Sequence, residues 1–153
     1  MGKQVVIFAL GQEEYGIPIE VVREITRLEA ARPIPQAPAY VEGVINIRGS
    51  AIPLINLRTR FGIASDDVLV SKEGEESKDQ KLALITEVNG EFVGFAVDQV
   101  REVRVLEDIV PPPQLVTAPF IAGIVNLPDR IIMYLNPDKI IEKDELQELH
   151  QVR

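Results

Sequence analysis

Cysteine and tryptophan are absent from this chain of 153 residues, and histidine occurs once. Without cysteine the chain has no disulfide, no thiolate metal site and no thiol catalysis. The single histidine, His150, excludes any metal motif that needs two histidines, and a lone histidine near the end of a chain is usually solvated. Five Phe and three Tyr offer little surface on which the bases of single-stranded nucleic acid can stack.

Positive charge is in the minority and long apolar runs are missing. The chain has 16 Lys and Arg against 24 Asp and Glu, so its formal net charge is −8. Such a surface repels phosphate backbones and anionic lipids, which argues against nucleic acid or a bare membrane as a partner. The apolar run at residues 5–10 is far too short to span a bilayer. We therefore expect a cytoplasmic protein with no cofactor, no bound metal and no direct membrane insertion.

Catalytic signatures are scarce as well. Neither of the glycine patterns that cradle phosphate, G-x-G-x-x-G and G-x-x-x-x-G-K, occurs. Carboxylates are plentiful, so a pair of acids working as in a glycosidase stays open. Most of them, however, lie in one acidic segment or at the starts of turns, where solvation and capping account for them. We expect that the protein is not an enzyme, with a carboxylate-based hydrolase as an alternative.

What the chain does contain is an internal repeat. The sequence YGIPIEVVREI at residues 15–25 returns as VGFAVDQVREV at residues 93–103. A second block, GVINI at residues 43–47, returns as GIVNL at residues 123–127, and a proline-rich connector separates the two blocks in both halves. Blocks that recur in the same order at nearly constant spacing indicate a duplication.

Each repeat has the pattern of short β-strands. Two strand-like segments, residues 82–88 and 91–97, flank an Asn-Gly pair at positions 89–90, which is the strongest two-residue signal for a hairpin. Residues 45–57 contain a second turn of this kind. Short strands at this spacing favour small barrels over an α/β sheet. Glu20 and Asp98 stand at equivalent places where the strand pattern ends, and we expect each to cap a brief helical turn.

The two repeats predict two barrel units within a single domain. We expect approximately residues 12–64 to form the first unit and residues 4–11 and 80–142 to form the second, with the N-terminal strand exchanged. Units of this size are marginal alone, so a packed interface should join them. The acidic residues 65–81 read as a mobile linker. Residues 143–153 have a capping pattern and one apolar face, which predicts a helical tail.

The equivalent bends of the two repeats carry aliphatic and charged residues that are candidates for a binding surface. The aliphatic set is Ile19, Val22, Val100 and Val103. If the units pack side by side, this set lines a shared apolar groove; the alternative is that it belongs to the core. Arg48 beside Gly49 is, by spacing alone, more typical of a solvated turn. Glu24 is matched by Glu102, so its simplest role is structural or in a surface ion pair.

The motif FALGQEEYGI at residues 8–17 is followed by VREI at residues 22–25, GVINIRG at residues 43–49 and GFAVD at residues 94–98. In this order the motifs resemble the CheW family, the adaptors of bacterial chemotaxis. The resemblance covers roughly residues 4–142. It implies a mostly all-β fold of two SH3-like five-stranded β-barrels, partly intertwined, with short helices and a C-terminal helix, and no catalytic activity.

The resemblance also implies partners and contact residues. The partners are the cytoplasmic tip of a chemoreceptor (a methyl-accepting chemotaxis protein) and the regulatory domain of the histidine kinase CheA, which would recruit the protein to membrane receptor arrays. The aliphatic set then falls on or near the receptor groove, and Glu24, Arg48 and Gly49 fall where kinase and receptor contacts meet. A second kinase contact is expected on the other barrel, at Leu115, Val116 and Phe120. An alternative is a regulatory SH3-like barrel module of another two-component kinase system.

Overall fold

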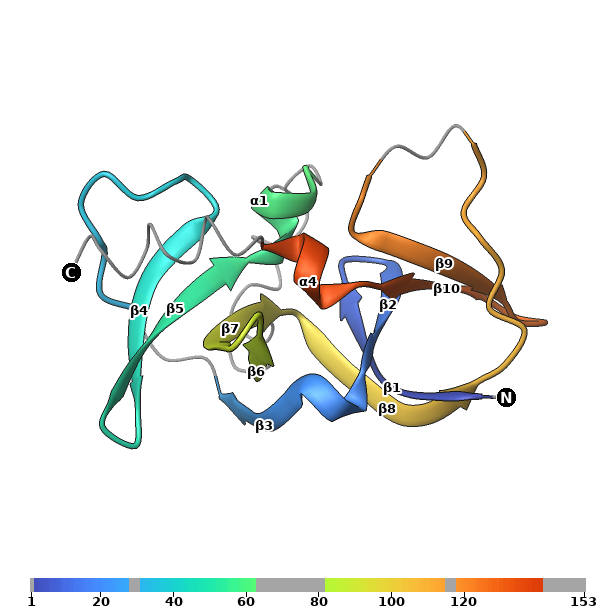
Figure 1. Ribbon diagram of the computed structural model, residues 1–153, viewed down its shortest axis with the longest axis horizontal. Helices are drawn as coiled ribbons and strands as arrows, with labels where there is room; N and C mark the ends of the chain where they lie inside the picture. Colours follow the sequence, from blue (N-terminus) through green and yellow to red (C-terminus); the bar gives the residue numbers. More distant parts are fainter. Residues whose placement is uncertain (1, 28–30, 63–81, 115–117, 142–153) are drawn as a thin grey trace, which may run out of the picture.

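The computed structural model describes residues 2–27, 31–62, 82–114 and 118–141, and within these ranges the chain is mostly β-strand (Figure 1). The expected acidic linker and the expected helical tail lie outside the described residues. Two short α-helices, α1 (Leu57–Phe61) and α4 (Pro137–Ile140), and the 3-10 turn η1 (Ile19–Val21) complete the described elements. The expected mostly all-β fold is confirmed.

The strands form two five-stranded sheets that lie next to each other in Figure 1, with α1 and α4 between them. We call the two sheets, with the helices that follow them, the first and second barrel. The first has the strand order β3 (Val22–Arg27), β6 (Leu82–Val88), β7 (Glu91–Val97), β5 (Ser50–Asn56) and β4 (Val41–Ile47). The second has the order β8 (Gln99–Leu106), β1 (Lys3–Leu10), β2 (Glu13–Pro18), β10 (Ile131–Leu135) and β9 (Ile121–Asn126).

Each barrel combines strands from both repeats. The hairpin β1–β2 of the first repeat belongs to the second barrel, and the hairpin β6–β7 of the second repeat belongs to the first. The expected boundaries of the units are therefore wrong. Residues 13–18 join the second barrel and residues 82–97 join the first, so that whole hairpins are exchanged and not the N-terminal strand alone.

The short connections explain this exchange. In the second barrel β1 is antiparallel to both β8 and β2, so β8 runs parallel to β2. If β3 occupied the place of β8, beside the hairpin of its own repeat, it would have to run parallel to β2, and a parallel crossover needs about a dozen residues or more. Only η1 (Ile19–Val21) separates β2 from β3, and only Asp98 separates β7 from β8. The chain must therefore pass into the other barrel at both points.

Both sheets curve until their edge strands approach. In the first barrel β3 and β4 are opposite edges, yet Glu24 on β3 forms an ion pair with Arg48 of the β4–β5 turn, with 2.8 Å between the charged atoms. In the second barrel Glu102 on the edge strand β8 pairs with Arg130 of the β9–β10 turn. An ion pair between the edges of one sheet requires the strong curvature of a small barrel.

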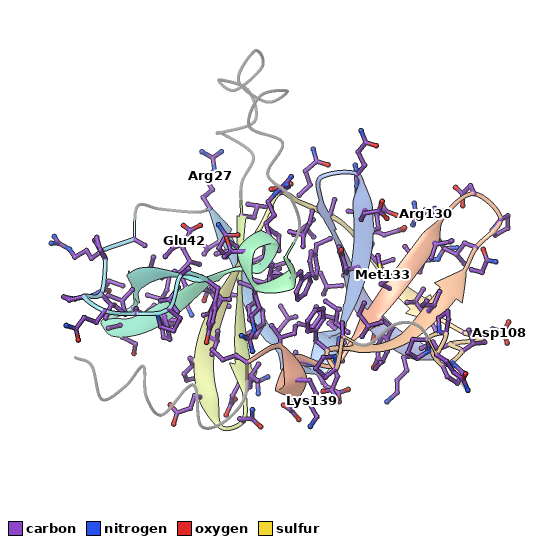
Figure 2. All side chains as sticks on the ribbon, turned by 90° about the horizontal axis from the view of Figure 1, so that it is seen from above. Arg27, Glu42, Asp108, Arg130, Met133 and Lys139 are labelled. Carbon is purple, nitrogen blue, oxygen red and sulfur yellow. The ribbon has the colours of Figure 1, made fainter. Side chains whose placement is uncertain are left out.

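The strand β1 is buried on both faces because it serves two cores. Val5 and Ile7 point into the core of the second barrel. Val6, Phe8 and Leu10, on the opposite face, belong to a larger central cluster that also takes buried residues from the first barrel. Alternate residues of a strand face opposite sides, so this run is apolar throughout. Side chains from both halves fill the space between the barrels, with Met133 of β10 near the middle (Figure 2).

One hairpin turn follows the sequence prediction, and two capping predictions do not. Asn89 and Gly90 both have positive φ, 53° and 82°, as a two-residue hairpin of this type requires, and they join β6 to β7 as expected. Glu20 lies inside η1, whose first turn has no side-chain cap. Asp98 stands between two strands and accepts a hydrogen bond from the backbone N–H of Gly11 instead. Because neither carboxylate precedes a helix, the expected caps are wrong.

Candidate protein-interaction surface

Three of the four aliphatic residues at the bends lie where the two barrels meet. Ile19 in η1, Val22 at the start of β3 and Val100 in β8 are half-buried and pack against the central cluster. The turn η1 contacts β6 of the first barrel and β1 of the second. Figure 1 shows β3, η1 and β8 along the lower side of the molecule. These three side chains are therefore anchored on the shared core while part of each stays open to solvent.

Val103, the fourth residue, is half exposed on the edge strand β8. Its counterpart in the repeat, Ile25 on the edge strand β3, is 43% exposed. Sequence reasoning missed Ile25, although the repeat already aligned it with Val103. Each barrel thus presents an aliphatic side chain on an edge strand beside the boundary, and neither of the two open readings, groove or core, describes the whole set.

The structure brings the charged candidates together at one end of the first barrel. Arg48 pairs with Glu24, and 81% of the Arg48 side chain remains exposed against 26% for Glu24. Arg48 and Gly49 have positive φ, 52° and 86°, and the backbone N–H of Gly49 donates to the side chain of Asn46. A non-glycine residue in this conformation is uncommon. The turn therefore holds an exposed guanidinium at a defined place.

The corresponding turn of the second barrel has a different character. Pro128 takes the place of Arg48, and Arg130, two residues later, lies between Glu14 and Glu102 with 29% of its side chain exposed. The hydrogen bond to Glu102 raises the pKa of Arg130 above its ordinary value. Glu14 also pairs with Arg101 at 3.2 Å. Figure 2 shows Arg130 in the half of the molecule opposite to Arg27 and Glu42. The arginine of this turn is thus held by carboxylates and is far less accessible.

Of the expected second contact, only Phe120 can be placed. Its ring stacks on that of Phe61 from α1, with centroids 4.3 Å apart and an angle of 10°. Phe120 is half-buried and packs against the central cluster. Leu115 and Val116 lie outside the described residues.

A metal-binding cluster and a membrane-spanning helix are both absent from residues 2–27, 31–62, 82–114 and 118–141. Within those ranges no three His, Cys, Asp or Glu side chains are grouped so as to hold a metal ion. The helices described there are all too short or too polar to cross a bilayer. His150 lies outside the described residues.

The two barrels exchange hairpins and present exposed apolar and charged groups at their junction and edges, and this fold has known relatives. The family model described as the CheW-like domain matches residues 4–145. The chain is 38% identical to the chemotaxis protein CheW of Treponema pallidum over 153 residues, covering 95% of this chain and 86% of that one. It is 33% identical to CheW of Helicobacter pylori, covering 92% and 82%.

A solved structure agrees with these matches. The crystal structure of the scaffolding protein TtCheW from Thermoanaerobacter tengcongensis superposes with a TM-score of 0.81 at 32% identity, covering 95% of this chain and 96% of that one. The chain therefore belongs to the CheW-like domain family, a family of chemotaxis adaptors and scaffolds.

Proposed function

We propose that this protein is a chemotaxis adaptor that couples the cytoplasmic tip of a chemoreceptor to the regulatory domain of the histidine kinase CheA and catalyses no reaction. An adaptor has to hold two partners at once, which requires separate surfaces on one body. The observation that carries the proposal is that this chain, a member of the CheW-like family, presents an aliphatic surface at the barrel boundary and an exposed arginine turn at one barrel end.

The aliphatic surface fits a helical receptor tip. Ile19, Val22 and Val100 rest on the central cluster, and Val103 and Ile25 extend the surface along the two edge strands. An apolar stripe of a helix binds such a surface through a few anchors spaced along its turns. Because Ile19, Val22 and Val100 already pack against the central cluster, these anchors lose little conformational freedom when a partner binds.

The turn at Arg48 and Gly49, with Glu24 beside it, is the proposed site where kinase and receptor contacts meet. A guanidinium that is mostly exposed offers several N–H donors to a partner's carboxylate or carbonyl groups. The second kinase contact is proposed on the other barrel around Phe120, with Leu115 and Val116. Through the receptor tip, the adaptor would reside at the cytoplasmic side of membrane receptor arrays.

The test is size-exclusion chromatography of the purified chain with a receptor-tip fragment and a kinase regulatory domain. The expected result is co-elution of all three. The pairwise dissociation constants should lie in the micromolar range, which corresponds to a binding free energy of about −8 kcal/mol. A chain that binds the kinase domain and never the receptor tip would instead be a regulatory barrel module of another kinase system. Binding to neither fragment would refute the proposal.

A further inference from the structure

The helix α1 (Leu57–Phe61) follows β5 of the first barrel, but three of its side chains reach across to the second barrel or to the point where the chain enters it. Arg58 pairs with Asp98 at 2.8 Å. The Nε of Arg60 donates to the backbone carbonyl of Ile140 in α4 at 2.7 Å. Phe61 stacks on Phe120, as described above, and also lies 5.4 Å from the ring of Tyr15. This short helix is therefore a direct connection between the barrels.

Asp98 is the centre of the polar part of this connection. It is the single residue between β7 and β8, where the chain passes from the first barrel to the second. Its backbone N–H donates to the carbonyl of Ala9 at 3.1 Å. Its Oδ2 accepts from the N–H of Gly11, in the β1–β2 turn, at 2.6 Å and from Nη2 of Arg58 at 2.8 Å. One carboxylate oxygen thus joins α1 of the first barrel to the hairpin of the second.

Partial burial shields this pair from solvent more than an exposed pair of the first barrel is shielded. The side chains of Arg58 and Asp98 are 20% and 26% exposed, against 50% and 39% for Arg23 and Glu87, which join β3 to β6 inside the first barrel. Solvent screens a half-buried pair less than an exposed one. The apolar central cluster between the barrels opposes their separation through burial and close packing. A charged hydrogen bond adds a directional contact, because it requires a defined geometry.

The pair does not arise from the repeat. Glu20 is the counterpart of Asp98, and Asp138 of α4 is the counterpart of Arg58, so two carboxylates stand where the ion pair would form. At that crossing the side chain of Asn89 donates to the backbone carbonyl of Ile141 instead. The arginine–aspartate pair is thus specific to one of the two crossings between the barrels.

We propose that Arg58 and Asp98 are positioning residues: their ion pair sets the angle between the two barrels. The claim about the angle stands without any partner. Its functional consequence rests on the proposed function. Val22 belongs to the first barrel, Val100 belongs to the second and Ile19 lies in the connection between them, so a receptor helix that contacts all three spans the boundary. A change in the angle between the barrels moves these anchors apart or together.

The test compares the full-length chain with Arg58→Gln and with a matched control, Arg23→Gln, which removes an arginine–carboxylate pair from within one barrel. Backbone residual dipolar couplings are measured by NMR, and binding of a receptor-tip fragment is titrated. We expect one rigid body to fit the couplings of the wild type and of Arg23→Gln, whereas Arg58→Gln needs a new relative orientation of the barrels. We also expect Arg58→Gln to weaken receptor-tip binding at least about 5-fold.

Asp98→Asn serves as a second variant, because an asparagine oxygen still accepts from Gly11 while the charge is lost; it replaces Arg58→Gln if circular dichroism shows that variant to be unfolded. Couplings of both folded variants that fit the wild-type orientation would overturn the proposal. A changed orientation with unchanged receptor affinity would overturn its link to binding. A wild type that binds no receptor tip would refute the proposed function, and the couplings alone would then decide the role of the pair.

Discussion

Replacing Arg48 or Arg130 by alanine removes an edge-to-edge ion pair from one barrel or the other, and the structure predicts opposite outcomes. Arg48 is 81% exposed, and an exposed pair contributes at most about 1 kcal/mol to stability. Arg130 is 29% exposed and neutralises Glu14, which is 13% exposed. Breaking a fully buried pair costs about 3–5 kcal/mol. Because Glu14 keeps Arg101, we expect a loss of about 2 kcal/mol for Arg130→Ala, between these two cases.

For a chain of this length, 1 kcal/mol corresponds to a shift of about 2–4 °C in Tm. Arg130→Ala should therefore melt about 4–8 °C below the wild type, and Arg48→Ala within about 4 °C of it. Binding should show the reverse order. Arg48→Ala removes the exposed guanidinium from the proposed contact and should weaken assembly with the kinase domain and the receptor tip, whereas folded Arg130→Ala should assemble normally.

Thermal circular dichroism and size-exclusion chromatography of the three-component mixture measure both properties on the same samples. Arg48→Gln, which keeps the length of the side chain and removes its charge, separates loss of charge from loss of packing. If Arg48→Ala melted as low as Arg130→Ala, or if Arg130→Ala alone lost its partners, the assignment of one arginine to binding and the other to stability would be wrong.

Three further substitutions test other parts of the structure. Val103→Asp should abolish receptor-tip pull-down with little change in Tm, since the side chain is half exposed, while the equally exposed Val110→Asp should bind normally; equal binding by both variants would argue against the aliphatic surface. Gly43→Ala should lower the free energy of unfolding in urea by about 3 kcal/mol or more. The φ of Gly43 is +143°, and the new methyl group would lie 2.1 Å from the carbonyl oxygen of Arg32. An unfolding midpoint equal to that of the wild type would contradict this. Burial raises the pKa of the Tyr15 hydroxyl, so above about pH 10 the unfolded chain loses this proton before the folded chain does, and the free energy of unfolding falls as the pH rises. Tyr15→Phe should make this fall less steep between about pH 9 and pH 11. If the slope of the free energy of unfolding against pH stayed unchanged, the prediction would be wrong.

The features that sequence reasoning predicted correctly are local ones. Asn89-Gly90 dictates a hairpin because both residues adopt positive φ readily, so the limits of β6 and β7 follow from neighbouring residues. The duplication was visible for the same reason, since it is a comparison of the chain with itself. The limits of the barrel units were wrong because they depend on strand order. The strand order shows that the place beside β1 is taken by β8, which runs parallel to β2. The three residues of η1 are too few to bring β3 into that place, so β3 joins the other barrel.

The candidate site divides in the same way. Residue type and repeat position selected Val22, Val100 and Val103 as candidates, the family resemblance added the turn at Arg48, and all of them stay predictions. These criteria were not enough to find Arg130 and Glu14, because Arg130 is displaced by two positions from the counterpart of Arg48 and Glu14 reaches it from another repeat. The expected caps failed because a carboxylate at the end of a strand has no preferred partner until the surrounding strands are in place.

The amino-acid order by itself determined the strands, the tight turns and the two-sided apolar run of β1, since each depends on conformational preference and alternation within a few residues. Tertiary structure alone decided which barrel each hairpin enters, that Arg48 is exposed while Arg130 is enclosed, and that Arg58 meets Asp98. The physical reason is that exposure and ion pairing are set by strands and helices distant in the chain, whose arrangement no local preference encodes.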